Sequence, residues 1–480
     1  MSTATFPHPP ALGRAATGIN RKPPPFQYPE EIKADFLKTR DIVFQDGRRV
    51  TAAEVWDFMT IEAPKRFPNA FSQSTNFGGR LSQDVRLFSS LKRGYLSLTL
   101  KDRLAESRKK GVPIVLVQGG QSYEPYFAAG AIPLRPGVII GWARGQQEGL
   151  NLRQNDVRGN DILEHGRRTI TIEACNQIAA HAAVAEGIVD VDLIAPYLCL
   201  RCSDMAYLVE THRNKQKEHP LHLVDHPISR NNPEGGVDYV AEGLHKLVEQ
   251  IDKLTGRKTT DEQLRAAIRQ RNRSHQLSRK LVHLLWQADV LPLNGSDLRA
   301  ASVQFDSAGD TTASFGVLEE LYDEVTERIK NGVRGQGLSE RPKRLFVSGS
   351  CVGANSAQVE DQGAVVVGHD DGWSQICVDV QEEGDPYKNL ARSILSFPYE
   401  LSTEARAKWT AEQVRQSRAD GILFMYNWGC NYQTGVARML ADAVKKETGL
   451  PTLTLEVGEL ARSEGVEQTA NRVESFIEML

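Results

Sequence analysis

The sequence predicts an α/β fold in which two doubly wound parallel-sheet domains are joined by a helical segment and preceded by an N-terminal extension. Three observations lead to this prediction. Short apolar runs typical of buried strands alternate with helical patterns from Gly111, and the alternation resumes at Lys343. Between these stretches the apolar spacing is helical over Gly236–Ala288, and a further helix is expected at Ser314–Gly332. The chain of 480 residues is also too long for one ordinary core. We expect the divisions 1–110 (extension), 111–230 (first α/β domain), 231–340 (helical segment) and 341–480 (second α/β domain).

The N-terminal extension has the weakest pattern of the four parts. Met1–Pro29 is rich in proline and polar residues and lacks the apolar core of a secretion signal, so we expect an extended arm. The charged run Lys101–Lys110 predicts an exposed helix. Four aromatic residues indicate that the extension docks on a neighbouring element: Trp56, Phe58, Phe67 and Phe71.

The first α/β domain combines short apolar runs with helical patterns in alternation. The expected strands are Pro113–Val117, Val191–Pro196 and Leu221–Val224, and the expected helices are Ser122–Ala129, Thr171–Ala185 and Met205–Thr211. This order of elements predicts a parallel sheet with helices on both faces.

The helical segment contains three expected helices. The first, Val237–Leu254, has apolar residues at helical spacing and ends at Gly256. The second begins at Thr260-Asp261-Glu262, a favourable helix start, and the third is Ser314–Gly332. The expected buried positions of the first two are Val240, Leu244, Leu247, Val248, Ile251, Leu264, Ile268, Leu281, Leu284 and Leu285.

The second α/β domain repeats the alternation. The expected strands are Arg344–Val347, Ala364–Val367, Ile422–Tyr426 and Thr452–Val457. The expected helices are Tyr387–Ser396, Ser402–Ala419, one that begins near Tyr432, and Val466–Leu480.

The composition excludes several classes of protein. With 40% hydrophobic and 25% charged residues and a net charge of −3, the chain has no global field that would favour nucleic acid or an anionic membrane. No apolar run approaches the roughly 18 residues of a membrane span, so we expect a cytoplasmic protein. Glycine-rich phosphate-binding loops are also missing, which argues against ATP chemistry on this chain.

Six cysteines are the residues most suggestive of chemistry: Cys175, Cys199, Cys202, Cys351, Cys377 and Cys430. A reducing compartment favours free thiols over disulfides. Cys430 is the most informative, because it follows the strand Ile422–Tyr426 and precedes a helix. A helix N-terminus favours thiolate over thiol, and open α/β sheets bind ligands at the carboxyl ends of their strands. Such a thiolate attacks a substrate or binds a metal, and the spacing alone leaves both open.

Several of the other cysteines share this setting. Cys351 follows a predicted strand directly, Cys202 follows one by six residues, and Cys175 lies near the start of a helix. Three or four thiolates that converge on an interdomain cleft suit iron–sulfur or zinc. Zinc is the weaker choice, since Cys199 and Cys202 form a single CxxC without a second pair. The alternative is that the thiols pack in the core.

Two carboxylate positions are further candidates. Glu124 lies among aromatic and small residues, where a raised pKa would suit a general base, although a surface or helix-capping glutamate is the alternative. Asp370-Asp371 at a strand end could bind Mg²⁺ or form a surface turn.

Several segments, in order, carry a resemblance to a known family: GVPIVLVQGGQSYEPYFAAGAIPLRPG, EACNQIAAHAAVAEG, VDLIAPYLCLRCSDMAYLVETH, GRKTTDEQLRAAIRQRNRSHQLSRKLVHLL, RLFVSGSCVG, GAVVVGHDD and FMYNWGCNYQTGVARML followed by LPTLTLEV. From about Gly111 to Leu480 the chain resembles the 2-hydroxyacyl-CoA dehydratase D-component family. This family includes subunits of ATP-dependent benzoyl-CoA reductase and the double-cubane cluster proteins.

The resemblance implies a [4Fe–4S] cluster held by Cys175, Cys202 and Cys430, with one iron left open for another ligand. Cys199 could replace Cys202, because Ser203 interrupts the family's Cys-Asp pair. An [8Fe–9S] double cubane is the alternative, with Cys199, Cys351 and Cys377 as possible further ligands. In that case Cys351 matches a family position, whereas Gly372 stands where the double-cubane relatives carry cysteine.

The resemblance also implies a function. The chain would be the iron–sulfur subunit of a radical-type CoA-thioester enzyme, fed electrons by a separate ATP-hydrolysing iron–sulfur activator. An electron on the thioester carbonyl of an acyl-CoA would drive loss of a 2-hydroxyl group, and in an aromatic-CoA it would reduce the ring. Glu124 is the candidate proton-transfer group, and the partner is a sister subunit or a second copy of the chain. The alternatives are a double-cubane reductase of small molecules and a non-catalytic partner subunit.

Overall fold

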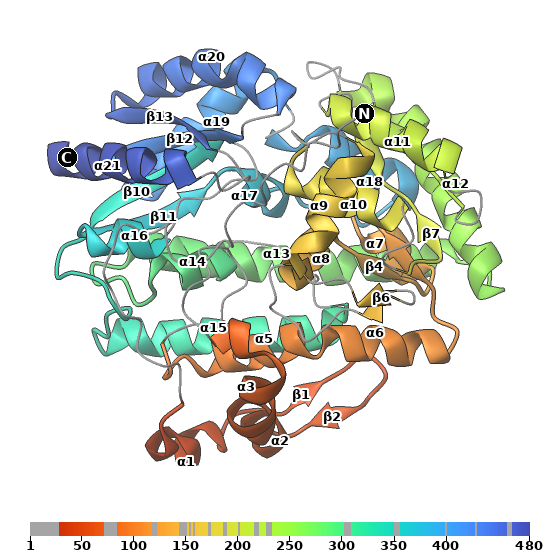
Figure 1. Cartoon of the computed structure of the whole chain (residues 1–480), viewed down its shortest axis with the longest axis horizontal. Coiled ribbons are helices and arrows are strands. Elements are labelled where there is room, and N and C mark those ends of the chain that lie inside the picture. The colour runs from red at the N-terminus through yellow and green to blue at the C-terminus, as the bar shows by residue number, and fades with distance from the viewer. Residues whose placement is uncertain are drawn as a thin grey trace, which may run out of the picture.

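The fold is built on two parallel sheets and the helices that cover them. A computed structural model describes residues 28–71, 84–117, 122–143, 151–152, 155–156, 159–170, 174–185, 190–199, 202–215, 220–226, 233–301, 309–349, 356–398, 401–427, 430–457 and 463–480. In Figure 1 the four-stranded sheet lies at the left, the three-stranded sheet lies at the right, and long helices cross the middle of the view. The predicted α/β class is confirmed, and the division into domains stays a prediction.

The four-stranded sheet is entirely parallel, in the order β11-β10-β12-β13. Its strands are β10 (Lys343–Gly349), β11 (Ala364–His369), β12 (Gly421–Asn427) and β13 (Thr452–Val457), which match the predicted strands closely. Adjacent apolar residues in each strand point to opposite faces. Phe346 and Phe424 pack on one face, whereas Leu345 and Leu423 pack on the other.

Helices bury both faces of this sheet, as its continuous apolar strands require. Residues of α13 (Asp261–Gln287), α17 (Asp371–Ile376), α19 (Thr403–Gln416) and α20 (Asn431–Thr448) cover the first face. Those of α16 (Ser356–Asp361) and α21 (Ser463–Met479) cover the second. The connections therefore leave this sheet on both sides.

The three-stranded sheet is also parallel and has the order β4-β3-β7. Its strands are β3 (Ile114–Leu116), β4 (Ile132–Leu134) and β7 (Leu193–Ile194). A separate parallel pair follows, β8 (Tyr197–Cys199) with β9 (Val224–His226). The strand expected at Leu221–Val224 thus begins at its predicted end, and Leu221 makes only an isolated bridge to Ile194.

The helices around the three-stranded sheet form two apolar layers. One layer contains α7 (Glu124–Ala128), α12 (Val237–Thr255) and α18 (Pro386–Leu395). The other contains α6 (Leu100–Lys109), α8 (Pro136–Ala143), α9 (Gly159–Thr169) and α10 (Asn176–Ala185). The remaining elements here are β5 (Asn151–Leu152), β6 (Asn155–Asp156), α11 (Ser203–Lys215) and η3 (Pro233–Gly236).

The predicted helical segment is confirmed as helix. Gly256 ends α12 in the left-handed conformation at φ +66°, and Thr260 and Gln263 form a reciprocal cap at the start of α13. The segment continues with α14 (Gly295–Ala301) and α15 (Thr311–Lys330). Because α13 contacts both α7 and α17, this one helix links the layers of the two sheets.

The N-terminal part packs on α15, as its aromatic residues predicted. Its elements are η1 (Glu30–Ile32), α1 (Lys33–Phe36), β1 (Ile42–Val43), β2 (Arg49–Val50), α2 (Ala52–Asp57), a π-helical turn η2 (Phe58–Glu62), α3 (Ala63–Arg66), α4 (Pro68–Phe71) and α5 (Phe88–Leu98). Trp56, Phe67 and Phe71 share one apolar cluster with Ala313 and Val317 of α15. None of the helices in the described parts combines the length and apolar character that a bilayer span requires.

The contact between α5 and α15 gives a testable pH dependence. The Glu324 carboxylate accepts hydrogen bonds from the N–H groups of Phe88 (2.7 Å) and Ser89 (3.0 Å), and burial raises its pKa to about 7. Between pH 4.5 and 7 the folded chain therefore binds more protons at this site than the unfolded chain does. The free energy of unfolding should fall as pH rises through that window, by on the order of 1 kcal/mol per pH unit.

Urea unfolding of the unsubstituted chain and Glu324→Gln at several pH values between 4.5 and 7 checks this expectation. Because the amide of Glu324→Gln does not titrate, the free energy of unfolding of this variant should change much less with pH than that of the unsubstituted chain. An unchanged slope in Glu324→Gln would assign the pH dependence to other groups.

Candidate functional site

Three of the predicted ligands lie at the N-termini of helices. Cys175 directly precedes α10, and its carbonyl accepts a hydrogen bond from the Ala179 N–H group (2.9 Å). Cys202 directly precedes α11, and Cys430 is the residue that caps α20. All three side chains are partly exposed. The positive end of a helix favours thiolate, so each position suits a metal ligand or a nucleophile.

The structure brings Cys175 and Cys202 to the same apolar cluster. Both side chains pack against residues that α10 and α11 bury between them: Ala174, Ile178, Ala182, Met205 and Leu208. The two helices contact each other, so the residues at their N-termini pack two thiols against the same cluster. Residues 27 positions apart in the sequence thus become neighbours of one cluster.

Cys430 lies where the order of strands in the four-stranded sheet reverses. From the central strand β10 the chain continues to β11 on one side, and β12 and β13 lie on the other side. Gly349 at the end of β10 pairs with Met425 of β12, and β12 ends at Asn427. In open α/β sheets the crevice at such a point is the usual place for a ligand. This part of the prediction for Cys430 agrees with the structure.

The described side chains of Cys175, Cys202 and Cys430 are not grouped as the ligands of one metal ion. Within the described ranges, no group of three or more His, Cys, Asp or Glu residues is arranged to hold a metal ion. The donor chemistry of the three thiols nevertheless fits an iron–sulfur cluster, which prefers thiolate ligands. Figure 1 places α11 and α20 at the upper edge of the view, on the two sides of the molecule.

The other cysteines differ in their setting. Cys377 directly follows α17, and its partly buried side chain packs against the core of the four-stranded sheet, where burial raises the pKa of its thiol to about 12. That environment favours a packing role over metal binding. The backbone of Cys199 pairs with His226 in the β8–β9 ladder, and Cys351 lies outside the described residues. The side chains of Asn427, Trp428 and Tyr432, which lie near Cys430 in the sequence, are also outside the described part.

Glu124 is the first residue of α7 and is buried, with 4% of its surface exposed. Its Oε1 atom lies 2.6 Å from Nε of Arg271. Burial raises the pKa of the carboxyl, and the Arg271 guanidinium opposes that rise. Burial excludes the alternative of a surface glutamate.

Buried tyrosines surround the start of α7. The Tyr126 hydroxyl donates to the Ala195 carbonyl (3.0 Å), and the Tyr197 hydroxyl donates to the Ser122 carbonyl (3.4 Å). Tyr123 is also buried. The carboxyl of Glu124 therefore lies in an aromatic, largely water-free place, as the sequence predicted for a proton-transfer group.

Asp370 is buried, and its carboxylate is hydrogen-bonded within the protein. It accepts hydrogen bonds from the Ser348 hydroxyl (2.6 Å), the Gly349 N–H group (3.0 Å) and Nη2 of Arg406 (3.1 Å). Asp371 lies 3.9 Å from Nη2 of Arg299. With these partners Asp370 fixes the end of β10, which fits neither a magnesium ligand nor a surface turn.

The sequence did not single out Arg271, although a signal was present. The apolar stripe of α13 runs from Leu264 and Ile268 to Leu281 and Leu285, and the buried residues between them are polar: Arg271, Asn272, His275 and Ser278. Polar side chains on a buried stripe need partners, which makes such an interruption worth noting.

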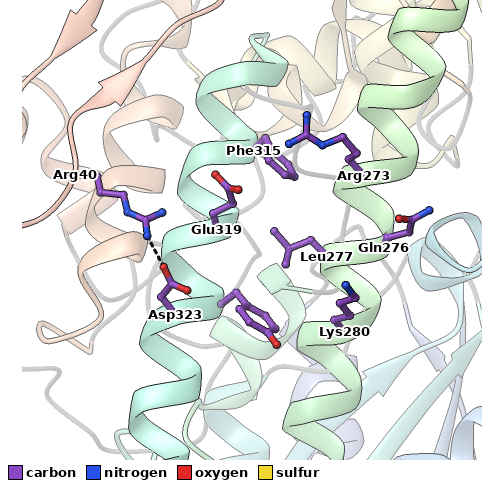
Figure 2. A pocket seen from close by; sticks show the side chains of 9 residues that line it. Arg40, Arg273, Gln276, Leu277, Lys280, Phe315, Glu319 and Asp323 are labelled. Carbon is purple, nitrogen blue, oxygen red and sulfur yellow. Dashed lines mark hydrogen bonds and ion pairs between the residues drawn. The ribbon is translucent and has the colours of Figure 1, made fainter.

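A hollow of about 340 Å³ lies between α13 and α15, away from the predicted site residues. Figure 2 shows Phe315 and Glu319 of α15 facing Arg273 and Leu277 of α13 across it. Arg40 and Asp323 form an ion pair of 2.7 Å at its edge. Its lining carries charges of both signs and includes none of the predicted ligands, so we assign it no part in the site.

Comparison with known proteins supports the resemblance that the sequence motifs carry. A family model described as "2-hydroxyglutaryl-CoA dehydratase, D-component" matches residues 122–480. This range includes Glu124 and all six cysteines.

Curated relatives are similar over parts of their length. The alpha subunit of (R)-2-hydroxyglutaryl-CoA dehydratase from Acidaminococcus fermentans is 22% identical over 271 residues, which cover 54% of this chain and 55% of that protein. The (R)-phenyllactyl-CoA dehydratase alpha subunit from Clostridium sporogenes is 21% identical over 62% of this chain and 74% of its own length. A benzoyl-CoA reductase subunit from Thauera aromatica is 26% identical over 49% of this chain and 61% of its own length. The match thus spans little more than half of the first relative.

Proposed function

Because the chain belongs to the 2-hydroxyglutaryl-CoA dehydratase D-component family, we propose that it is the iron–sulfur subunit of a CoA-thioester dehydratase or aromatic-CoA reductase. Family membership confirms the prediction made from the sequence motifs. The observation that carries the proposal is the placement of Cys175 and Cys202 on one apolar cluster, each at a helix N-terminus, with Cys430 in the same helix-terminal setting.

In this proposal Cys175, Cys202 and Cys430 hold a [4Fe–4S] cluster. When bound, such a cluster supplies single low-potential electrons and, at an iron without a cysteine ligand, a Lewis acid. The protein itself supplies three thiolates at the positive ends of helices and a buried carboxyl, Glu124, that moves a proton to or from the substrate. The tyrosines around Glu124 keep water from that carboxyl.

The partners are proposed from the family and from the names of the relatives. The family resemblance implies a separate ATP-hydrolysing iron–sulfur activator that would supply the electrons, and the sequence of this chain has no glycine-rich phosphate-binding loop of its own. The names of the relatives describe subunits, so we propose that the chain works with a sister subunit or a second copy of itself. The substrate is an acyl-CoA or aromatic-CoA thioester.

Anaerobic purification of the chain with any subunit that accompanies it tests the proposal. We expect about four irons and four sulfides per chain. With an activator, ATP and a reductant, a panel of 2-hydroxyacyl-CoA and aromatic-CoA thioesters should include one that is converted, as followed by mass spectrometry. About eight irons per chain would indicate the double cubane instead. A chain without iron that converts no thioester would be a non-catalytic partner subunit, and the proposal would fail.

A further inference from the structure

The buried polar stretch of α13 joins the candidate carboxyl to the four-stranded sheet. Arg271 contacts Glu124 through Nε, and its other two nitrogens donate to the carbonyls of Val378 (2.9 Å) and Gln375 (3.4 Å). Its side chain is 6% exposed. One guanidinium thus holds α7 and, at the same time, the end of α17 with the segment that follows it.

Neighbouring residues of α13 hold that segment independently of Glu124. Asn272 donates to the Val380 carbonyl (2.8 Å) and accepts from the Val380 N–H group (3.0 Å). Arg279 donates to the Ile376 carbonyl (2.5 Å) and to Asp379 (2.7 Å). The segment therefore keeps a fixed position on α13 through several bonds, and Arg271 alone extends this arrangement to Glu124 among the contacts described.

The two oxygens of Glu124 have different surroundings. Oε1 contacts Arg271, whereas Oε2 is buried and has no hydrogen-bond partner within the described residues. A buried oxygen without a partner is unfavourable, and a proton or a hydrogen bond from a bound molecule relieves it. Oε2 is therefore the atom of this carboxyl that is available for chemistry.

We propose that Arg271 is the positioning residue of Glu124: it fixes Oε1 and presents Oε2 as the atom that exchanges the proton with the substrate. The inference rests on the proposed function for the identity of the reaction. As the proton passes to Oε2, an O–H bond forms, the electron pair of the broken bond stays on the substrate, and Glu124 becomes neutral. The guanidinium stays positive and keeps the same carbonyl partners in both states.

The charges around the Glu124 carboxyl determine the direction in which its pKa should shift when Arg271 is replaced. Arg271 is the cation in contact with Glu124, and the other groups that face this region are Tyr123, Tyr126, Tyr197 and His275. Burial and the two arginines Arg271 and Arg279 keep the pKa of His275 well below its ordinary value, so it stays neutral. Loss of Arg271 removes the cation that opposes the rise in the pKa of Glu124. The pH at which Glu124 ionises should therefore move upward.

Arg271→Gln and Arg279→Gln form a matched pair for the test. Both remove bonds to the segment 375–379, but only Arg271 contacts Glu124. We expect the acid limb of the pH profile of kcat to shift upward by about 1 unit or more in Arg271→Gln. Arg271→Lys should recover part of the shift, and Arg279→Gln should leave the limb in place. Equal shifts in Arg271→Gln and Arg279→Gln would overturn the proposal.

A second measurement does not depend on activity. Urea unfolding of Glu124→Gln, Arg271→Gln and the double variant gives a coupling energy across several pH values. We expect a coupling that falls at low pH, where Glu124 is protonated. A coupling near zero at every pH would show that Arg271 does not hold the carboxylate. If the coupling is present but Glu124→Gln stays fully active, Arg271 holds Glu124 as inferred, and it is the proton-transfer role within the proposed function that fails.

Discussion

Alanine in place of Cys175 or Cys430 should leave the anaerobically purified chain with background iron and no CoA-thioester turnover. In the proposed site each substitution removes one of three thiolate ligands, and a [4Fe–4S] cluster left with two cysteines should not be retained. Iron and sulfide analysis, together with the visible spectrum of the purified protein, measures the effect. Because these side chains are partly exposed, the variants should remain folded.

Cys377→Ala is the matched control for this experiment. Its partly buried thiol packs against the apolar core of the four-stranded sheet and has a raised pKa, so the substitution should cost about 1 kcal/mol of unfolding free energy and leave the iron content unchanged. If Cys377→Ala lost the iron while Cys430→Ala retained it, the proposed ligand set would be wrong. A loss of half of about eight irons in Cys351→Ala would instead favour the double cubane.

The strands β10, β11 and β12 of the four-stranded sheet were predictable because they are apolar runs with clear ends, and Ala364–His369 is buried at every residue. The edge strand Thr452–Val457 is less buried and alternates in polarity, and its bounds were also located to the residue. β4 of the other sheet was missed, since Pro133 interrupts a run of only three residues. Proline is tolerated there because β4 is an edge strand, and its position in the sheet becomes visible only once β3 is beside it.

The candidate site was predictable to a similar degree. Helix N-termini at Cys175, Cys202 and Cys430 follow from local patterns, and the structure has them. Cys175 and Cys202 share one apolar cluster because α10 packs on α11. The local sequence around either cysteine does not predict that contact. The partner of Glu124 was likewise invisible, because Arg271 lies 147 positions away in the sequence.

Asp370 was misjudged for a related reason. Its sequence context, two adjacent aspartates after a strand, is typical of turns and cation sites. The residue that decides its role is Arg406 on α19, and both side chains of this pair are only 2% exposed. A buried ion pair arises from tertiary packing, so a local motif predicts the carboxylate but not its use.

Asp370→Ala should therefore destabilise the chain strongly, by about 3–5 kcal/mol, because it leaves the buried guanidinium of Arg406 without its anion. The Ser348 hydroxyl and the Gly349 N–H group lose their acceptor as well. Urea unfolding at neutral pH measures the change in midpoint. Asp289→Ala breaks the exposed pair with Arg418 (3.4 Å) and should change the unfolding free energy by less than about 1 kcal/mol.

The double variant Asp370→Ala, Arg406→Met distinguishes an unpaired charge from a simple loss of packing. Removing both charges takes away the cost of a lone buried cation, so the double variant should be more stable than Asp370→Ala alone. Equal or lower stability would mean that packing at the end of β10 dominates. Gly349 makes that outcome informative, since its φ of +139° and the close approach of Met425 leave no room for a side chain. Arg406 donates to the Gly349 carbonyl (2.7 Å), and Asp370 accepts from the Gly349 N–H group. In that case the pair would fix a backbone position that only glycine can occupy, two residues before Cys351.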